Sequence, residues 1–290
     1  MMSSRRPSVC PVSLKGVSKQ SRDSDEAAQP FMKWAGGKRR LLPDLIRHLP
    51  EQYGTYFEPF LGGGALFFAV RPKRGVLSDT NERLVRTWKT VRDAPEALIE
   101  KLSAFPHDEE FFLDQRKRDI DVEDDVEVAA WMLYLNRTAF NGLYRVNSKG
   151  GFNVPFGRYE NPTICDVGRI RHCSEVLSGV TIHHRDFTAV LEEAQQGDFV
   201  YFDPPYVPLS KSSSFTGYTR DGFTLDDQAR LRDLAVALKK RGVAVLLSNS
   251  AAPQVYELYA DGFDLREVKV SRAINSKASG RGKIAELLIR

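Results

Sequence analysis

The sequence predicts a doubly wound α/β sheet that is interrupted by one inserted domain. Short runs of β-branched and aromatic residues alternate with helical patterns over most of the 290 residues, which is typical of parallel strands joined by helical crossovers. A glycine-rich turn follows the first strand candidate, where such sheets commonly bind ligands. The alternation stops between about residues 82 and 165, where helical patterns and a turn-rich stretch follow one another. We interpret this interval as the insertion.

The individual elements follow from the spacing of apolar residues. The strand candidates are Thr55–Phe57, Gly75–Leu77, Val180–His183, Asp198–Phe202, Val243–Leu247, Phe263–Val268 and Ile284–Ile289. Helices are expected in the sheet domain at Arg40–Leu49, Ala65–Val70, Asp166–Leu177 and Asp226–Lys240, and in the insertion at Glu82–Arg92, Pro95–Ser103, Asp108–Asp119 and Val126–Phe140. We therefore expect a catalytic domain made of residues 30–81 and 166–290, and an inserted domain at residues 82–165.

Composition limits the class of protein. Residues 1–29 are rich in serine and lack an apolar period, so we expect a disordered tail there. The 42 basic and 38 acidic residues nearly balance, so any surface for a polyanion must be local. The three cysteines form no CxxC pair and have no histidine at ligand spacing, which argues against a disulfide framework and a zinc site. No apolar stretch approaches the ~20 residues of a membrane span. We expect a cytoplasmic protein without a metal.

The most informative motif is Asp203-Pro204-Pro205-Tyr206, which ends the apolar run before it. Each proline fixes its own φ and restricts the residue that precedes it, so the turn is stiff. The Asp203 carboxylate and the Pro204 carbonyl can each accept a hydrogen from an exocyclic amine, while Tyr206 offers a ring face to a planar heterocycle. The motif predicts methyl transfer to an aromatic amine. A proline-stiffened turn without chemistry is the alternative.

Two glycine-rich turns accompany this motif. Residues 58–65, EPFLGGGA, follow a strand candidate and precede a helix, and Asp79 closes the next strand about twenty positions on. That spacing is typical of an acidic residue that binds ribose hydroxyls. The segment 33–38, KWAGGK, precedes a helix and suits a carboxylate, but it lacks the spacing of a P-loop. A nucleoside site and a plain helix-capping turn both remain open for the first turn when it is taken alone.

The ordered set of these motifs resembles Dam-type (D12 class, alpha group) site-specific DNA adenine-N6 methyltransferases over residues 30–290. The segments that carry the resemblance are residues 33–38, 58–65, 77–81, 186–187 and 203–206. It implies the Rossmann-like fold of class I methyltransferases, S-adenosylmethionine as the methyl donor, and double-stranded DNA as the partner of a monomer associated with the nucleoid. By the same resemblance Trp34, Lys38, Asp79 and Asp203 stand at donor-site positions, Phe60 and Gly62 lie along the donor, and Asp186 and Phe187 border its adenine.

The insertion carries a basic strip at residues 137–159, RTAFNGLYRVNSKGGFNVPFGRY, which contains no acidic residue. Basic residues interleaved with aromatic ones suit phosphate neutralisation, and an arginine on a β-hairpin in the major groove can bind guanine O6 and N7 together. A solvated basic loop is equally compatible with composition alone. The strip resembles the hairpin of members that read GATC, which implies DNA contacts by Lys33, Arg137, Asn141, Leu143, Arg145, Pro155, Arg158 and Tyr159. Arg145 is then the expected base reader, with Lys33 as a second guanine contact.

Two other functions compete with a DNA adenine methyltransferase. Methyltransferases that act on RNA or on a protein glutamine amide usually carry NPPY, so Asp203 and the basic strip argue against them. A catalytically silent DNA-binding module is the second alternative, and the intact donor motifs argue against it.

Overall fold

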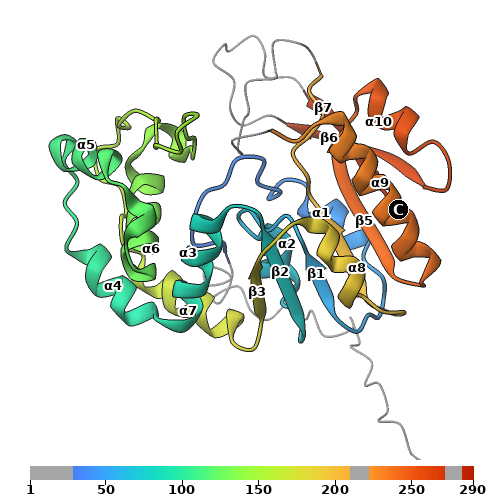
Figure 1. The fold of residues 1–290 in the computed structure, drawn as a ribbon, viewed down its shortest axis with the longest axis horizontal. Coiled ribbons are helices and arrows are strands. Elements are labelled where there is room, and N and C mark those ends of the chain that lie inside the picture. Colours follow the sequence, from blue (N-terminus) through green and yellow to red (C-terminus); the bar gives the residue numbers. More distant parts are fainter. Residues whose placement is uncertain (1–28, 210–221, 272–282) are drawn as a thin grey trace, which may run out of the picture.

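The computed structural model describes residues 29–209, 222–271 and 283–290 and has a seven-stranded sheet at its centre (Figure 1). The strand order is β3-β2-β1-β4-β5-β7-β6. The strands are β1 (Tyr56–Glu58), β2 (Gly75–Asp79), β3 (Thr181–His184), β4 (Phe199–Phe202), β5 (Ala244–Ser250), β6 (Leu265–Ser271) and β7 (Lys283–Ile289). Strands β1 to β5 pair parallel with one another, whereas β7 pairs antiparallel with β5 and β6. The predicted doubly wound sheet is confirmed.

Alternate residues of the buried strands supply two hydrophobic cores. Phe199 and Tyr201 of β4 belong to one core, and Val200 and Phe202 to the other, because successive side chains of a strand point to opposite faces. The first core includes residues of α1 (Leu42–Arg47), α2 (Ala65–Val70), α3 (Glu82–Asp93) and α7 (Val167–Leu177). The second includes residues of α8 (Val190–Glu193), α9 (Leu225–Lys240) and α10 (Pro253–Leu258). The sheet is therefore covered on both faces.

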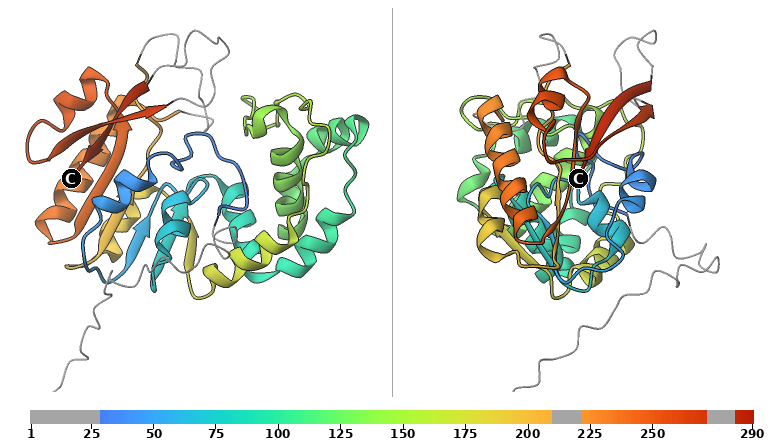
Figure 2. Two further views of the ribbon diagram at one scale, coloured as in Figure 1. Left: turned by 180° about the vertical axis from the view of Figure 1, so that it is seen from behind. Right: turned by 90° about the vertical axis from the view of Figure 1, so that its right-hand side faces the viewer.

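The insertion stands beside the β3 edge of the sheet rather than on either face (Figures 1 and 2). It contains α4 (Pro95–Ser103), α5 (Glu109–Lys117), α6 (Asp125–Thr138) and the 3₁₀ turns η2 (Ile120–Val122) and η3 (Phe140–Gly142). Its buried residues, such as Trp131 and Phe112, belong to the same core as the sheet face covered by α3. Since α3 contacts β2 and β3 as well as α6, this helix joins the two parts.

The basic strip forms an irregular antiparallel hairpin. Within residues 138–160 two isolated antiparallel bridges form, Ala139 with Phe156 and Val146 with Phe152. Asn141 and Gly142 have φ values of 55° and 64°, so two successive residues leave the strand conformation. Buried Tyr144, Phe152 and Val154 anchor the segment in the core. The two arms therefore pair over only part of their length, and side-chain packing fixes the rest.

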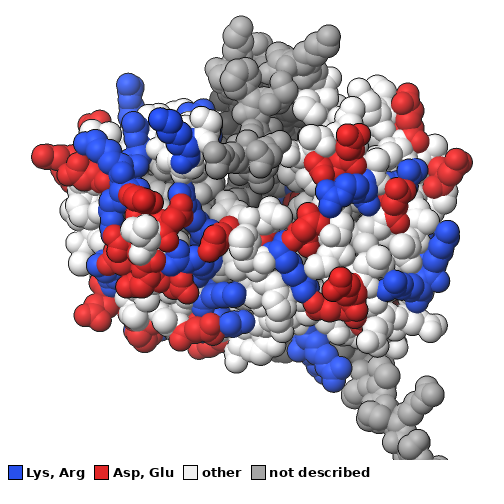
Figure 3. All heavy atoms as spheres, viewed as in Figure 1, with Lys and Arg blue, Asp and Glu red and all other residues white. Residues whose placement is uncertain are grey.

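Several acidic residues of the insertion form ion pairs. Asp121 pairs with Arg83, Asp125 with Arg86, and Glu127 with both Arg118 and Lys101. Red side chains gather on the flank of the insertion and blue ones along its upper edge (Figure 3).

Two further features complete the fold. The short helices α8 and α10 were not expected from the sequence, and among the described residues no helix is long and apolar enough to cross a membrane. The predicted tail lies outside the described residues, apart from Gln29.

Candidate active site

The polar residues of the candidate site lie where neighbouring parallel strands end. Glu58 is the last residue of β1, Asp79 the last of β2, and Asp203 directly follows β4. Ser248 and Asn249 lie near the end of β5, which pairs with β4. The carboxyl ends of parallel strands meet at one edge of a sheet, which is the usual ligand site in this architecture.

Asp203 uses one carboxylate oxygen for all of its observed bonds. The Lys38 ammonium lies 2.7 Å from Oδ1, and the Ser248 hydroxyl donates to the same atom at 3.0 Å. Burial raises the pKa of Asp203, while Lys38 and Ser248 oppose that rise. Among the residues that the structure describes, Oδ2 has no hydrogen-bond or ion-pair partner. This oxygen is therefore available to an incoming donor group.

The loop after Asp203 is fixed from α9 and β5. Gln228 Nε2 donates to the Pro205 carbonyl at 2.9 Å, and Val207 N donates to Asn249 Oδ1 at 3.2 Å. Within residues 29–209, 222–271 and 283–290 no donor bonds to the Pro204 carbonyl. The loop thus presents two acceptors without occupied partners, the Asp203 Oδ2 atom and the Pro204 oxygen.

Tyr206 turns its hydroxyl away from those acceptors. The hydroxyl donates to Glu286 Oε2 on β7 at 3.0 Å, while the Lys38 ammonium lies 4.6 Å from the centre of its ring. A cation at this distance from a ring face is attracted to it. Lys38 consequently contacts both Asp203 and Tyr206. It also donates to the Gly36 carbonyl at 2.5 Å.

Glu58 places a second, almost fully buried carboxyl beside this group. The Tyr56 hydroxyl donates to its Oε2 atom at 2.7 Å. Burial raises the pKa of Glu58 to about 8, opposed by the Tyr56 hydrogen bond, while the nearby Asp203 charge raises it further. Glu58 is therefore a protonated carboxylic acid at neutral pH, and the charge of the site is carried by Asp203 and Lys38.

The glycine turn fits the nucleoside end of S-adenosylmethionine. Gly62 has a φ of 46°, and a Cβ added there would lie 2.8 Å from Cδ1 of Trp34, so only glycine lets the indole lie against this backbone. Asp79 accepts from Gly62 N at 3.2 Å through Oδ2 and from Asn81 N at 2.9 Å through Oδ1. Each carboxylate oxygen has a second acceptor position. Asp79 can thus receive ribose hydroxyls while it holds the turn.

Phe60 and Phe187 form an aromatic group at the other side of the turn. Their ring centroids are 5.3 Å apart with an interplanar angle of 25°, and Phe223 lies 5.6 Å from Phe60. Asp186 caps the 3₁₀ turn η4 (Phe187–Ala189) and pairs with Arg230 at 3.4 Å. A flat apolar ring with a carboxylate at its edge is suited to a purine. The structure therefore places Phe187, and with it the adjacent Asp186, against Phe60.

The basic strip presents one exposed face and one buried face. Asn141, Arg145, Pro155 and Arg158 are exposed, and Leu143 and Tyr159 are half-buried. Arg145 Nε donates to Asn153 Oδ1 at 2.7 Å, which directs the guanidinium along the surface. A groove of about 430 Å³ is lined by Phe140, Asn141, Pro155, Phe156, Gly157, Arg158 and Tyr159. The exposed face of the strip contains half of the eight predicted DNA contacts.

Lys33 and Arg137 approach the strip from different elements. Lys33 lies in the catalytic part, with its backbone bonded to Asn136 and its ammonium 5.2 Å from the Tyr159 ring. Burial, and secondarily the Arg137 charge, lowers the pKa of Lys33. Arg137 donates to the Phe31 carbonyl at 2.8 Å and is half-buried. In this structure Arg137 supports the Lys33 segment and lies apart from the exposed face of the strip.

Several site residues were missed by the motif search. Ser248 and Asn249 follow the apolar run of β5, and their position at the end of a strand adjacent to β4 was the available signal. Gln228 and Glu286 come from segments that the sequence does not connect with the site, and no local pattern marks them. Tyr144 was included in the strip but received no role of its own.

Comparison with known proteins agrees with this geometry. A family model described as D12 class N6 adenine-specific DNA methyltransferase matches residues 34–274. The type II methyltransferase M1.LlaDCHI of Lactococcus lactis subsp. cremoris is 48% identical over 269 residues, which cover 90% of this chain and 94% of that protein. The type II methyltransferase M.MjaIII of Methanocaldococcus jannaschii is 42% identical, with 90% and 98% covered, and a DNA adenine methylase of Vibrio cholerae is 39% identical, with 89% and 94% covered.

The match to the family model spans most of the chain, and the relatives align over nearly its whole length. The predicted resemblance and the class I methyltransferase fold are confirmed. The chain belongs to the D12 class of N6 adenine-specific DNA methyltransferases.

Proposed function

We propose that this enzyme methylates N6 of an adenine that has been flipped out of duplex DNA, within the sequence GATC. Membership of the family establishes adenine-N6 methylation of DNA and implies S-adenosylmethionine as the donor. The observation that carries the proposal is the pair of available acceptors at the end of β4, the Asp203 Oδ2 atom and the Pro204 carbonyl. An amine carries two hydrogens, and these two acceptors match them.

The acceptor pair solves the chemical difficulty of this substrate. The adenine amine is a poor nucleophile because its lone pair is delocalised into the ring. Acceptors outside the ring plane favour a pyramidal nitrogen and release that lone pair, so the loop stabilises the transition state more than the ground state. When bound, S-adenosylmethionine supplies an electrophilic methyl group. Asp203 need not remove a proton first, because the methylated, cationic amine loses its proton after the bond has formed.

Extrusion of the base follows from where the acceptors lie. In duplex DNA one hydrogen of the adenine N6 amine is bonded to thymine, and only the other is exposed in the major groove. Asp203 has only 20% of its side chain exposed, and Pro204 is buried. An adenine must therefore leave the duplex to place its amine against both oxygens. The Tyr206 ring beside them offers a stacking surface.

The sequence GATC is supported by the arrangement of cationic side chains. Arg145 is exposed on the strip, and Lys33 lies where the catalytic part meets the same strip at Gly142 and Tyr159. Arginine and lysine are the residues that most often bind guanine in the major groove. We assign Arg145 and Lys33 to guanine, Leu143 and Pro155 to apolar contact with a thymine methyl, and Asn141, Arg158 and Tyr159 to the surrounding backbone and bases.

The test uses duplexes that differ only at the target site. Purified enzyme is incubated with S-adenosylmethionine and duplexes that contain GATC, GTAC or no adenine in the site, and the nucleosides are identified by mass spectrometry. We expect N6-methyladenine only from GATC, and a rise in fluorescence when 2-aminopurine replaces the target adenine. Equal methylation of all adenine-containing duplexes contradicts the assignment of GATC, and unchanged 2-aminopurine fluorescence in a bound duplex contradicts extrusion. Single-stranded RNA and a glutamine peptide serve as competing substrates.

A further inference from the structure

We propose that Tyr144 is a positioning residue that couples donor binding to DNA reading through its ring stack on Trp34. This inference rests on the proposed function, because it links the donor site with the segment that reads DNA. The two ring centroids are 5.4 Å apart and the interplanar angle is 23°, so the rings are stacked. Trp34 comes from the turn before α1, and Tyr144 comes from the basic strip.

Trp34 transmits the state of the donor turn. Its indole lies 2.8 Å from the position that an added Cβ would take at Gly62, and its own Cβ atom lies 3.2 Å from that position at Gly63. Gly62 N in turn bonds to Asp79, and the Gly62 carbonyl accepts from Trp88 Nε1 at 3.2 Å. A ligand that fills this turn therefore restricts the indole. Because Tyr144 packs on the indole, the restriction reaches the strip directly.

Tyr144 is held so that the stack can transmit a displacement. Only 8% of the residue is exposed, and its ring also lies 6.0 Å from that of Phe152 on the returning arm of the strip. Burial raises the pKa of its hydroxyl, while the nearby Arg83 and Asn81, the residue that caps α3, oppose that rise. Asn81 N bonds to Asp79 Oδ1. The donor-site aspartate and the strip thus share one connected group of contacts.

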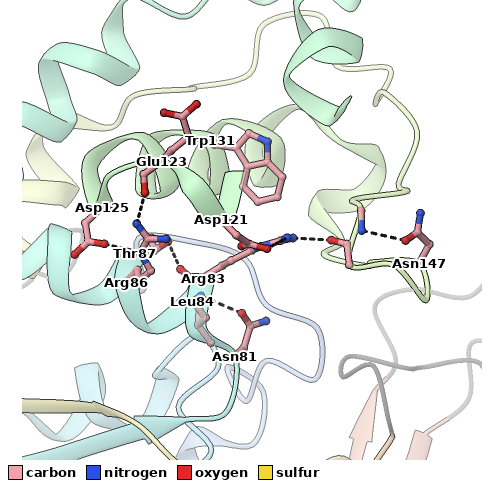
Figure 4. Close-up of polar contacts among 12 residues, drawn as sticks. Asn81, Arg83, Leu84, Arg86, Thr87, Asp121, Glu123, Asp125, Trp131 and Asn147 are labelled. Carbon is pink, nitrogen blue, oxygen red and sulfur yellow. Dashed lines mark hydrogen bonds and ion pairs between the residues drawn. The ribbon is translucent and has the colours of Figure 1, made fainter. Parts of the chain in front are cut away.

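Arg83 fixes the far end of the strip to the same helix. Its guanidinium donates to both oxygens of Asp121, at 2.6 and 2.7 Å, and to the Gly150 carbonyl at 2.8 Å (Figure 4). Asn147 closes the turn around Gly150 by accepting from Lys149 N and Gly151 N. Arg83 also lies 5.4 Å from the Trp131 ring. These contacts tie the turn of the strip to α3, the helix that Asn81 caps.

The consequence is a reciprocal effect of the two ligands. A donor that orders Trp34 also orders Tyr144 and the adjacent Arg145. The strip therefore loses less conformational freedom when DNA binds afterwards. By linkage, DNA must tighten donor binding by the same factor. The sequence neighbours Tyr144 and Arg145 have different roles. The buried Tyr144 ring couples the two binding sites, and the exposed Arg145 guanidinium contacts the base.

The experiment measures that factor in variants. The dissociation constant of S-adenosylhomocysteine is determined by calorimetry with and without a GATC duplex, for the wild type, Tyr144→Leu, Tyr144→Phe and Phe105→Leu. Leucine keeps apolar bulk but removes the ring, phenylalanine keeps the ring but removes the hydroxyl, and Phe105→Leu removes another partly buried ring of the insertion. Circular dichroism and thermal unfolding establish that each variant is folded.

The expected results separate the inference from the proposed function. The wild type should bind the ligand more tightly with DNA by a factor of about 5 to 150, the usual range of such coupling. Tyr144→Leu should bring the factor close to one, while Tyr144→Phe and Phe105→Leu retain it. A wild-type factor of one, or an undiminished factor in Tyr144→Leu, overturns the inference. If Tyr144→Leu does not fold, Trp34→Leu replaces it as the test variant. The inference then requires that Trp34→Leu still binds both ligands but loses the coupling factor. A coupling factor that persists in Trp34→Leu overturns the inference. A wild type that binds neither ligand defeats the proposed function itself.

Discussion

The Lys38 ammonium forms an ion pair with Asp203 Oδ1 at 2.7 Å while it also lies over the Tyr206 ring. One lysine from the turn before α1 thus fixes both the acidic and the aromatic residue of the loop after β4. The ion pair occupies Oδ1, and among the described residues Oδ2 has no hydrogen-bond or ion-pair partner. Lys38 therefore orients the carboxylate as well as neutralising it, and this relationship makes several measurable predictions.

Replacement of Asp203 should remove catalysis and spare DNA binding. Asp203→Ala deletes one of the two amine acceptors, and the loss of one aligned polar group in a preorganised site costs about 10²- to 10³-fold in kcat. Single-turnover methyl transfer and fluorescence anisotropy with a GATC duplex measure the two effects. Glu257→Ala, an exposed acidic residue of α10, is the matched control and should retain full activity. Near wild-type turnover in Asp203→Ala would falsify the role given to this carboxylate.

Removal of Lys38 should shift the pH dependence of methyl transfer. Burial raises the pKa of Asp203 and Lys38 opposes the rise, so Lys38→Met lets the pKa rise further. The ionised carboxylate is then lost at a higher pH as the solution is acidified. The acidic limb of the kcat profile should consequently move to higher pH in this variant. A limb at the wild-type position would show that Asp203 protonation does not limit the reaction.

Arg145 and Arg158 should separate base reading from phosphate binding. Arg145→Ala should lose about 1 to 3 kcal/mol of discrimination at one base pair, because a guanine contact has about that value. Arg158→Ala should weaken the binding of all duplexes alike and reduce the slope of log Kd against log salt concentration by about one. Methylation rates are compared on GATC and its single-base variants at several salt concentrations. An unchanged order of preference in Arg145→Ala excludes it as a reader.

Glu58 should make the enzyme less stable as the pH rises. Its folded pKa of about 8 lies above the unfolded value, so the folded state binds more protons between these two values. The stability due to the neutral carboxyl is complete below the unfolded pKa and is lost as the pH rises through the folded pKa. Glu58→Gln cannot ionise, so its midpoint of urea unfolding should fall less between pH 5 and 8.5 than that of the wild type. Parallel curves would contradict the assignment.

The local patterns of the sequence were sufficient for most of the fold. All seven strand candidates became strands, because buried parallel strands read as short apolar runs bounded by turns. Helices such as α9 were predicted almost to the residue, since Leu231, Leu234, Ala235 and Leu238 repeat on one face. In the structure a capping box formed by Thr224 and Asp227 begins this helix. The short helices α8 and α10 were missed because four to six residues are too few to establish a period.

The basic strip shows what the local sequence could not determine. Its turn dipeptides and its resemblance to the hairpin of related enzymes predicted a hairpin, but the conformations of Asn141 and Gly142 limit the pairing to two isolated bridges. What fixes the strip is the packing of Tyr144, Phe152 and Val154 in the core, together with Arg83 at its turn. Those contacts join residues far apart in the sequence, and the secondary-structure propensity of a local segment contains no information about them.

By itself the sequence determined the sheet, the stiff turn at Asp203, the ribose-spaced Asp79 and the position of the cationic strip, because each depends on residues close together in the chain. Only the tertiary structure decided that Lys38 orients Asp203, that Gln228 and Asn249 hold the loop, and that Trp34 stacks on Tyr144. The physical reason is that parallel strands bring their carboxyl ends together whatever their separation in the chain. Side chains from distant segments then complete the site, and their partners exist only once the sheet has formed.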